Sequence, residues 1–210
     1  MRRPAAVAGF GAIGFSVLTI VGLALINPPG GNYKVKNVHD FLRTGHRVAV
    51  FTGIYVEVLA VVGLVLVLAY LRDLLPAGVA RTFWGLGMIA TTAFALGWAV
   101  MASGAVARAY GGSGIVVSAP TSYLVSEIGG TIVWGPAAIM LAVALVIFAL
   151  SSGAALSAWL RWTTLALALI GLASPAFFPS LALLIWGLVT GVWLLTTGRR
   201  APAAPAPGTP

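Results

Sequence analysis

The stretch HRVAVFTGIYVEVLAVVGLVLVLAY, from His46 to Tyr70, decides the fold class because it is apolar over a length that can cross a bilayer. A helix needs about 20 apolar residues to span a hydrocarbon core of about 30 Å. One acidic residue, Glu57, lies in the middle of this run. The stretch therefore predicts a membrane-spanning helix that carries a carboxyl group inside the bilayer.

The whole chain has the composition of a membrane protein. Of its 210 residues, 60% are hydrophobic and 8% are charged, whereas about 25% of the residues in a soluble domain are charged. The chain has no cysteine, which excludes disulfides and cysteine-bound metals. The net charge is +8, but the basic residues are scattered at the ends of apolar runs. That distribution indicates topology signals and lipid contacts, and it argues against nucleic-acid binding.

We predict an all-α, polytopic membrane protein with six transmembrane helices in an antiparallel bundle. The apolar runs are Ala5 to Ile26, Val48 to Leu71, Phe83 to Ala107, Ile128 to Leu150, Leu156 to Ala173, and Phe177 to Thr197. The first run is too long for a cleaved signal peptide, so we interpret it as a span. The spans form one domain, residues 1–198, and we expect the Pro/Ala-rich tail, residues 199–210, to be disordered and cytoplasmic.

The distribution of Lys and Arg predicts the orientation. With the N-terminus inside, seven of the twelve basic side chains are cytoplasmic and five are outside. The positive-inside rule therefore favours both termini on the cytoplasmic side of a bacterial inner membrane.

Two outer connections are longer than the others. The first, NPPGGNYKVKNVHDFLRTGHR from Asn27 to Arg47, has apolar residues at helical spacing, Val38, Phe41 and Leu42, and Val48 directly after the stretch continues this pattern. Its opposite face carries His39, Arg43, His46 and Arg47. This pattern predicts an amphipathic helix at the outer membrane interface. The second, YGGSGIVVSAPTSYLVSE from Tyr110 to Glu127, is rich in Gly and Ser, and we expect a mobile loop or lid there.

Two segments, FLRTGHRVAVFTGIYVEVLA (Phe41 to Ala60) and LSAWLRWTTLALALIGL (Leu156 to Leu172), resemble a broad group of uncharacterised actinobacterial six-span membrane proteins that share a domain of unknown function. The similarity is one of layout: an outer amphipathic segment ends in His-Arg before span two, and span five starts with Trp-Leu. The chain departs from this layout at Ala158, where we would expect a proline. The resemblance implies the six-span fold and no activity.

Glu57 is the main candidate for a functional group, because an ionisable side chain at the bilayer centre costs about 2.5–3.5 kcal/mol on insertion scales. Counting residues from the outer end of each span places three indoles near its depth: Trp98, Trp134 and Trp186. Gly53 and His46 fall on the same helix face toward the outside, and an unbroken helix would extend this stripe to Arg43 and His39. The pattern predicts a ligand or proton site, or alternatively a carboxyl that only fixes helix packing through a hydrogen bond.

Three classes of function fit these features. The first is a non-catalytic accessory protein or a binder of a lipid or small apolar molecule, with membrane lipids as partners. The second is a proton-linked carrier that uses Glu57. The third and least favoured is an intramembrane lipid-modifying enzyme with His46 and Asp40 as its acid–base pair. We expect no catalytic residues, cofactor or metal, because His39 and His46 are too far apart to share one zinc ion.

Three smaller patterns predict contacts. Gly187 and Gly191 form a G-x-x-x-G pattern, which indicates either packing within the bundle or a homo-oligomer or partner-protein interface. Arg108 and Glu127 lie at outer span ends and could form an ion pair. Gly135 and Pro136 predict a kink in the fourth span.

Overall fold

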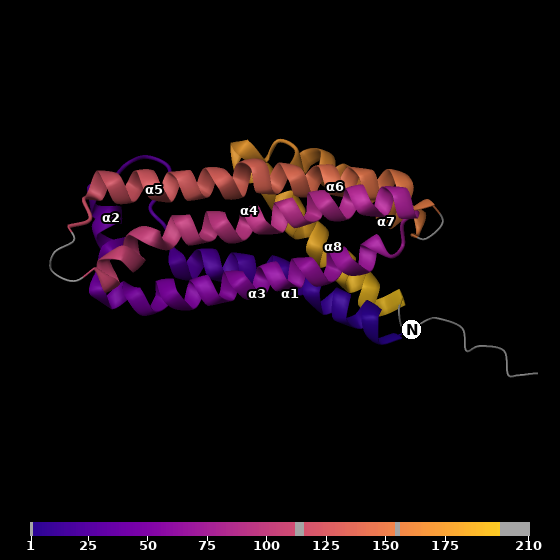
Figure 1. Ribbon diagram of the computed structural model, residues 1–210, viewed down its shortest axis with the longest axis horizontal. Helices are drawn as coiled ribbons and strands as arrows, with labels where there is room; N and C mark the ends of the chain where they lie inside the picture. The colour runs from indigo at the N-terminus through magenta and orange to yellow at the C-terminus, as the bar shows by residue number, and fades with distance from the viewer. Residues whose placement is uncertain (1, 112–115, 154–155, 198–210) are drawn as a thin grey trace, which may run out of the picture.

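The computed structural model describes residues 2–111, 116–153 and 156–197, and it contains helices and turns with no strand in these segments (Figure 1). The α-helices are α1 (Arg2–Ile26), α2 (Val35–Leu42), α3 (Arg47–Arg72), α4 (Ala77–Tyr110), α5 (Ala119–Ile132), α6 (Ala138–Ser151), α7 (Ala158–Gly171) and α8 (Leu181–Thr197). Short helices occupy η1 (Thr44–His46), η3 (Val133–Ala137), η5 (Ser174–Ala176) and η6 (Phe178–Ser180). This architecture confirms the all-α prediction.

Five helical segments of the described chain are long and apolar enough to cross a membrane. They are Pro4–Ile26, Thr44–Arg72, Ala77–Tyr110, Ala119–Ser151 and Phe178–Thr197. The polytopic bundle is therefore confirmed. The remaining predicted span contains α7, whose 14 residues rise only about 21 Å. This length is short of the hydrocarbon thickness, so a sixth crossing stays a prediction.

The predicted kink at Gly135 and Pro136 falls on a π-helical segment within one continuous rod. α5, η3 and α6 follow one another without a break from Ala119 to Ser151, and η3 is a π-helical segment with Pro136 inside it. Proline cannot donate the usual backbone hydrogen bond, and a single wide turn accommodates it without ending the helix.

The second long outer connection is shorter than we predicted. α5 begins at Ala119, and the hydroxyl of Ser118 accepts a hydrogen bond from the backbone N–H of Thr121 at 3.2 Å as an N-cap. The residues from Ala119 to Glu127 are therefore helical, and the expectation of a loop was wrong for them. Residues 112–115 and the predicted disordered tail, 199–210, lie outside the described residues.

The predicted amphipathic helix is confirmed as α2, which lies across one end of the bundle and contacts α4 and α5 (Figure 1). Its buried side chains are Val38, Phe41 and Leu42. Val48 does not share this face, since α2 ends at Leu42 and the side chain of Val48 is 77% exposed. The assignment of Val48 to the apolar face was wrong.

Glycines hold α1 directly against α3. A Cβ atom on Gly53 would lie 3.0 Å from the carbonyl oxygen of Gly22, and one on Gly11 would lie 2.7 Å from that of Gly63. These distances leave no room for any side chain. Because lipid supplies no hydrophobic drive between helices, such close backbone packing is a main source of association in membranes. We refer to this contact as the α1–α3 seam.

The G-x-x-x-G pattern of α8 also packs inside the chain. A Cβ atom on Gly191 would lie 2.7 Å from the carbonyl oxygen of Gly9, and one on Gly187 would lie 2.9 Å from that of Ala12. α1 therefore occupies this face of α8. The alternative of a homo-oligomer or partner interface through these two glycines does not stand, because no free surface remains on them.

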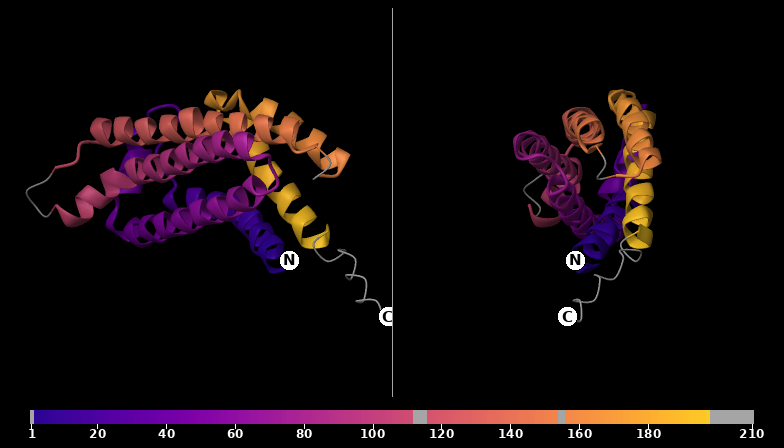
Figure 2. Two further views of the ribbon diagram at one scale, coloured as in Figure 1. Left: turned by 45° about the vertical axis from the view of Figure 1, so that its right-hand side comes forward. Right: turned by 90° about the vertical axis from the view of Figure 1, so that its right-hand side faces the viewer.

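The α7–α8 hairpin stops partway along the rod formed by α5 and α6, as Figure 2 shows. Its tip meets the rod near η3, where the rings of Phe177 and Trp134 are 5.1 Å apart. Turns within the tip satisfy its backbone, as in the bonds from Phe177 N–H to Ser174 and from Ser180 N–H to Phe177. These bonds satisfy part of the backbone of the tip, as a non-helical segment would require if it lay inside a membrane.

Replacing Gly63 by alanine tests the α1–α3 seam. The new methyl group would meet the backbone of Gly11, so we expect Gly63→Ala to lower the free energy of unfolding by about 1–3 kcal/mol through overpacking. Gly85 in α4 is the matched control, because a Cβ atom there meets nothing within 4 Å. Thermal unfolding in detergent measures both. Equal stability of the two variants would show that the seam is loose.

Candidate functional site

Glu57 is buried in the α1–α3 seam and does not face lipid. Its side chain is 1% exposed, and its carboxyl group lies over Gly22, where a Cβ atom would overlap it. Neither carboxyl oxygen has a partner with hydrogen-bond geometry among the described residues, although the backbone N–H of Leu23 lies close enough to interact with the carboxyl group. The carboxyl group of Glu57 therefore occupies the space that a side chain at residue 22 would fill. No basic side chain among the described residues forms an ion pair with Glu57.

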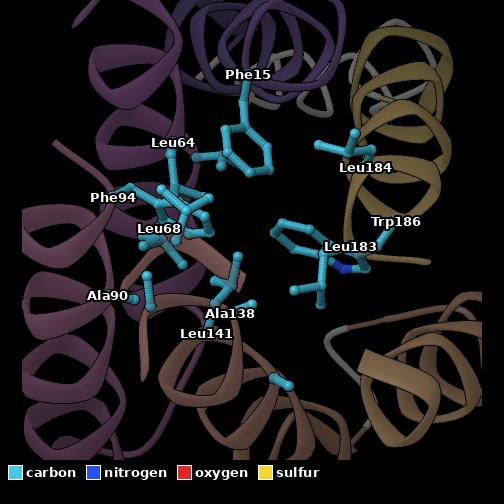
Figure 3. Packing of buried hydrophobic residues seen from close by; sticks show 14 of the residues in the cluster. Phe15, Leu64, Leu68, Ala90, Phe94, Ala138, Leu141, Leu183, Leu184 and Trp186 are labelled. Atoms are coloured by element: carbon cyan, nitrogen blue, oxygen red, sulfur yellow. The ribbon is translucent and has the colours of Figure 1, made fainter. Parts of the chain in front are cut away.

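The three predicted tryptophans do not form one layer with Glu57. Trp98 and Trp134 pack edge to face with ring centroids 5.9 Å apart. Trp186 lies apart from them, in the core beside Leu183 and facing Phe15 (Figure 3).

The depth of Trp186 follows from its contacts with α1. The hydroxyl of Ser16 donates to the carbonyl oxygen of Leu184 at 2.7 Å, which aligns this part of α8 with Ser16. Ser16 is six residues from Gly22, or about 9 Å along the helix. Trp186 is thus more than one turn from Glu57, and its assignment to the same site was wrong.

His46 and Arg47 tie helix ends together and do not belong to a site with Glu57. The Nε2 atom of His46 is 3.0 Å from the carbonyl oxygen of Ile26, the last residue of α1. The guanidinium of Arg47 donates to the carbonyl oxygen of Arg108, in the last turn of α4, at 3.4 Å. Basic groups at helix C-termini satisfy free carbonyls and interact favourably with the helix dipole.

The predicted stripe from His39 to Glu57 is also interrupted. Arg43 is extended between α2 and η1, so His39 lies on a different helix from Glu57. Both His39 and Arg43 are exposed. The stripe was wrong because it assumed an unbroken helix.

A pocket of about 880 Å³ lies between α1 and α5, above the tip of the α7–α8 hairpin. Its floor contains Trp134 and Phe177, and its α1 wall contains Ile20, Leu23 and Ala24. Of the six residues that we predicted for a ligand or proton site, the pocket includes Trp134 alone. Glu57 is excluded because Gly22, which it contacts, lies on the α3 side of α1.

The pocket changes from apolar at its floor to polar at its outer end. Asn27 and Glu127 lie at the outer end, together with the backbone of Gly30 and Gly31, and Thr131 lies between this end and Trp134. A volume of this size with few polar groups is typical of sites for small apolar or amphiphilic molecules.

The connection after α1 forms the outer edge of the pocket, and α5 holds it through Gly31. The backbone N–H of Gly31 donates to Oε1 of Glu127 at 3.0 Å, and the hydroxyl of Tyr123 donates to the carbonyl oxygen of Gly31. The rings of Tyr33 and Tyr123 pack edge to face, with centroids 5.1 Å apart. Both polar groups of Gly31 are therefore bound by α5, which fixes the position of this connection.

Part of the pocket lining is exposed. Ile20 is 51% exposed and Phe177 is 40% exposed, and both line the pocket. They lie on the side where the α7–α8 hairpin ends. An apolar group can therefore enter the pocket sideways from this face.

The sequence did not reveal the role of Glu127. The predicted ion pair with Arg108 is absent, since Arg72 and Asp73 form the single ion pair within the described segments. Glu127 binds the backbone of Gly31 instead. No group of three or more potential metal ligands occurs in the residues that the structure describes.

Comparison of the chain with known protein families, with characterised proteins and with solved structures finds no match. The resemblance of layout to six-span proteins therefore stays a prediction. Any assignment of function rests on the geometry of the pocket and of Glu57.

Substitution of Glu57 tests whether its carboxyl lacks a partner. A buried, unpartnered polar group costs about 1–3 kcal/mol, so we expect Glu57→Met, which is apolar and similar in shape, to raise the thermal unfolding midpoint. Glu57→Gln keeps a polar amide in the same place, and we expect no such gain from it. A lower midpoint for Glu57→Met would show that the carboxyl fixes the seam through a bond.

Proposed function

We propose that the protein is a non-catalytic membrane protein that binds one lipid or small amphiphilic molecule in the pocket between α1 and α5. The observation that carries this proposal is the gradient within the pocket, from Trp134 and Phe177 at the floor to Asn27 and Glu127 at the outer end. An amphiphile has the same gradient along its length. The apolar part of the amphiphile would contact the aromatic floor of the pocket, and its polar head would lie at the outer end.

The exposed side of the pocket supports a lipid-derived ligand. α7 and α8 do not cover the outer part of α1 and α5, and the exposed apolar side chains of Ile20 and Phe177 line this opening. A molecule that diffuses in the membrane would reach the pocket without crossing water.

A proton-linked carrier is the second candidate, and the buried carboxyl of Glu57 favours it. Proton transfer through a membrane protein generally uses a chain of titratable groups. The pocket lies across α1 from Glu57, so a carrier of this kind would need a movement that opens the α1–α3 seam. We therefore rank it below simple binding.

We also propose the bacterial inner membrane as the location, with both termini in the cytoplasm. Two cation–aromatic pairs support this orientation: Arg72 lies 5.1 Å from the ring of Trp84, and Arg161 lies 5.4 Å from that of Trp162. Both pairs lie at the end of the bundle where α1 begins. Tryptophan and basic residues together are typical of a membrane interface, and basic residues favour the cytoplasmic one.

A bulky substitution in the α1 wall tests the proposal. Ala24 is exposed and lines the pocket. We expect the wild-type protein to carry a lipid-sized adduct in native mass spectrometry, and we expect Ala24→Trp to obstruct the pocket and to remove at least nine-tenths of this adduct. Val17, which is 43% exposed and lies about 10 Å deeper on α1, is outside the lining. Val17→Trp is therefore the control and should retain the adduct.

Loss of the adduct in both variants, or in neither, would refute binding in this pocket. The thermal unfolding midpoint of each variant separates a filled pocket from a misfolded protein. The two substitutions add the same side chain to the same helix, so they differ chiefly in position.

A further inference from the structure

We propose that the ligand carries a protonated amine in its head group and that Glu127 binds this amine, an inference that rests on the proposed function. Glu127 is the only charged side chain that lines the pocket in the described chain. The protein has twelve Lys and Arg residues and only four acidic ones. The lining of the pocket is therefore negatively charged, whereas the chain as a whole has a net charge of +8.

The hydrogen bonds of Glu127 leave part of its carboxylate free for a ligand. Its Oε1 atom accepts the bond from Gly31 at 3.0 Å, and the phenol of Tyr123, which donates to the carbonyl oxygen of Gly31, is the other polar group close to this carboxylate. A carboxylate can accept several hydrogen bonds. The bond to Gly31 therefore orients the carboxylate without using all of its acceptor capacity.

The position of Glu127 matches that of an amphiphile's head group. Trp134 follows Glu127 by seven residues, or two helical turns, and lies on nearly the same face of the α5–η3 rod, about 10 Å deeper. Both residues line the pocket. A ligand whose amine contacts Glu127 would therefore direct its chain along this face toward the aromatic floor.

The chemistry of the site selects an amine over an anionic head group. An ammonium donates charge-assisted hydrogen bonds to a carboxylate, and such bonds are stronger than those between neutral groups. A phosphate or sulfate without an amine would meet the negative charge of Glu127 and no facing cation in the lining. The attraction is also screened less than at an open surface, because Glu127 is half-buried.

Head-group selection in native mass spectrometry tests this inference. The full-length protein is exchanged into detergent with equal amounts of phosphatidylethanolamine and phosphatidylglycerol that have the same acyl chains. We expect the wild type to retain the ethanolamine lipid about tenfold over the glycerol lipid. Glu127→Gln keeps an acceptor for Gly31 but removes the charge, and we expect its ratio to fall to about one.

Glu57→Gln is the matched control, since it makes the same chemical change at a carboxyl outside the pocket, and its ratio should equal that of the wild type. Loosening of the connection at Gly31 would lower the retention of both lipids and leave their ratio unchanged. An unchanged ratio in Glu127→Gln would therefore overturn the inference, whatever the total retention.

A second arm distinguishes a bilayer lipid from a smaller amphiphilic amine. Dodecylammonium is added to the lipid-loaded protein, with dodecanol as the uncharged probe of equal chain length. Displacement by dodecylammonium at a concentration at least tenfold below that of dodecanol supports amine recognition and assigns the site to the smaller molecule. Retention of the ethanolamine lipid against both probes supports recognition of the bilayer lipid.

Failure of this inference can be told apart from failure of the proposed function. If the wild type retains both lipids equally and Ala24→Trp abolishes retention of both, the pocket binds lipid and the amine preference is wrong. If Ala24→Trp changes neither, both proposals are wrong. A preference for the glycerol lipid would overturn the role of Glu127 directly.

Discussion

The close contact of α1 with α3 is the constraint on which the rest of the structure depends. Gly22 and Gly53 bring the two backbones together near Glu57, and His46 binds the carbonyl of Ile26 at the end of α1. Ile26, the last residue of α1, lies level with Gly53, so α1 ends about 9 Å short of the outer end of α3. The chain that follows crosses to α5, where Glu127 and Tyr123 hold Gly31, and this crossing forms the outer edge of the pocket.

The second determinant is the short α7–α8 hairpin. Its tip contacts Trp134 through Phe177 and covers only the inner part of α1 and of the α5–α6 rod (Figure 2). The pocket lies above this tip. A longer α7–α8 hairpin would fill the space that the ligand is proposed to occupy. The short length of α7 therefore leaves room for the pocket.

The helices and the amphipathic α2 could be predicted because apolar periodicity is local, but the site could not. The counted depths assumed straight helices of equal length, and α7 is short while Arg43 separates α2 from α3. Glu57 was the predicted site because an acidic residue within a span is rare, but the acidic residue that lines the pocket is Glu127. Glu127 is 96 residues from Gly31 in the sequence, and the fold brings the two together. The spacing of Gly187 and Gly191 also could not show whether these glycines pack against a helix of the same chain or against another protein.

We propose that the tip of the α7–α8 hairpin lies within the hydrocarbon and leaves the pocket open to lipid, although Phe178–Thr197 taken alone is long enough to cross a membrane. The chain has no cysteine, so a single cysteine reports its own environment. Phe178→Cys places a thiol at the tip, where the native side chain is 74% exposed, and Tyr33→Cys is the positive control on the outer connection. A membrane-impermeant maleimide should label Tyr33→Cys and leave Phe178→Cys unlabelled in both intact and opened membranes. Labelling of Phe178→Cys from either side would contradict the account.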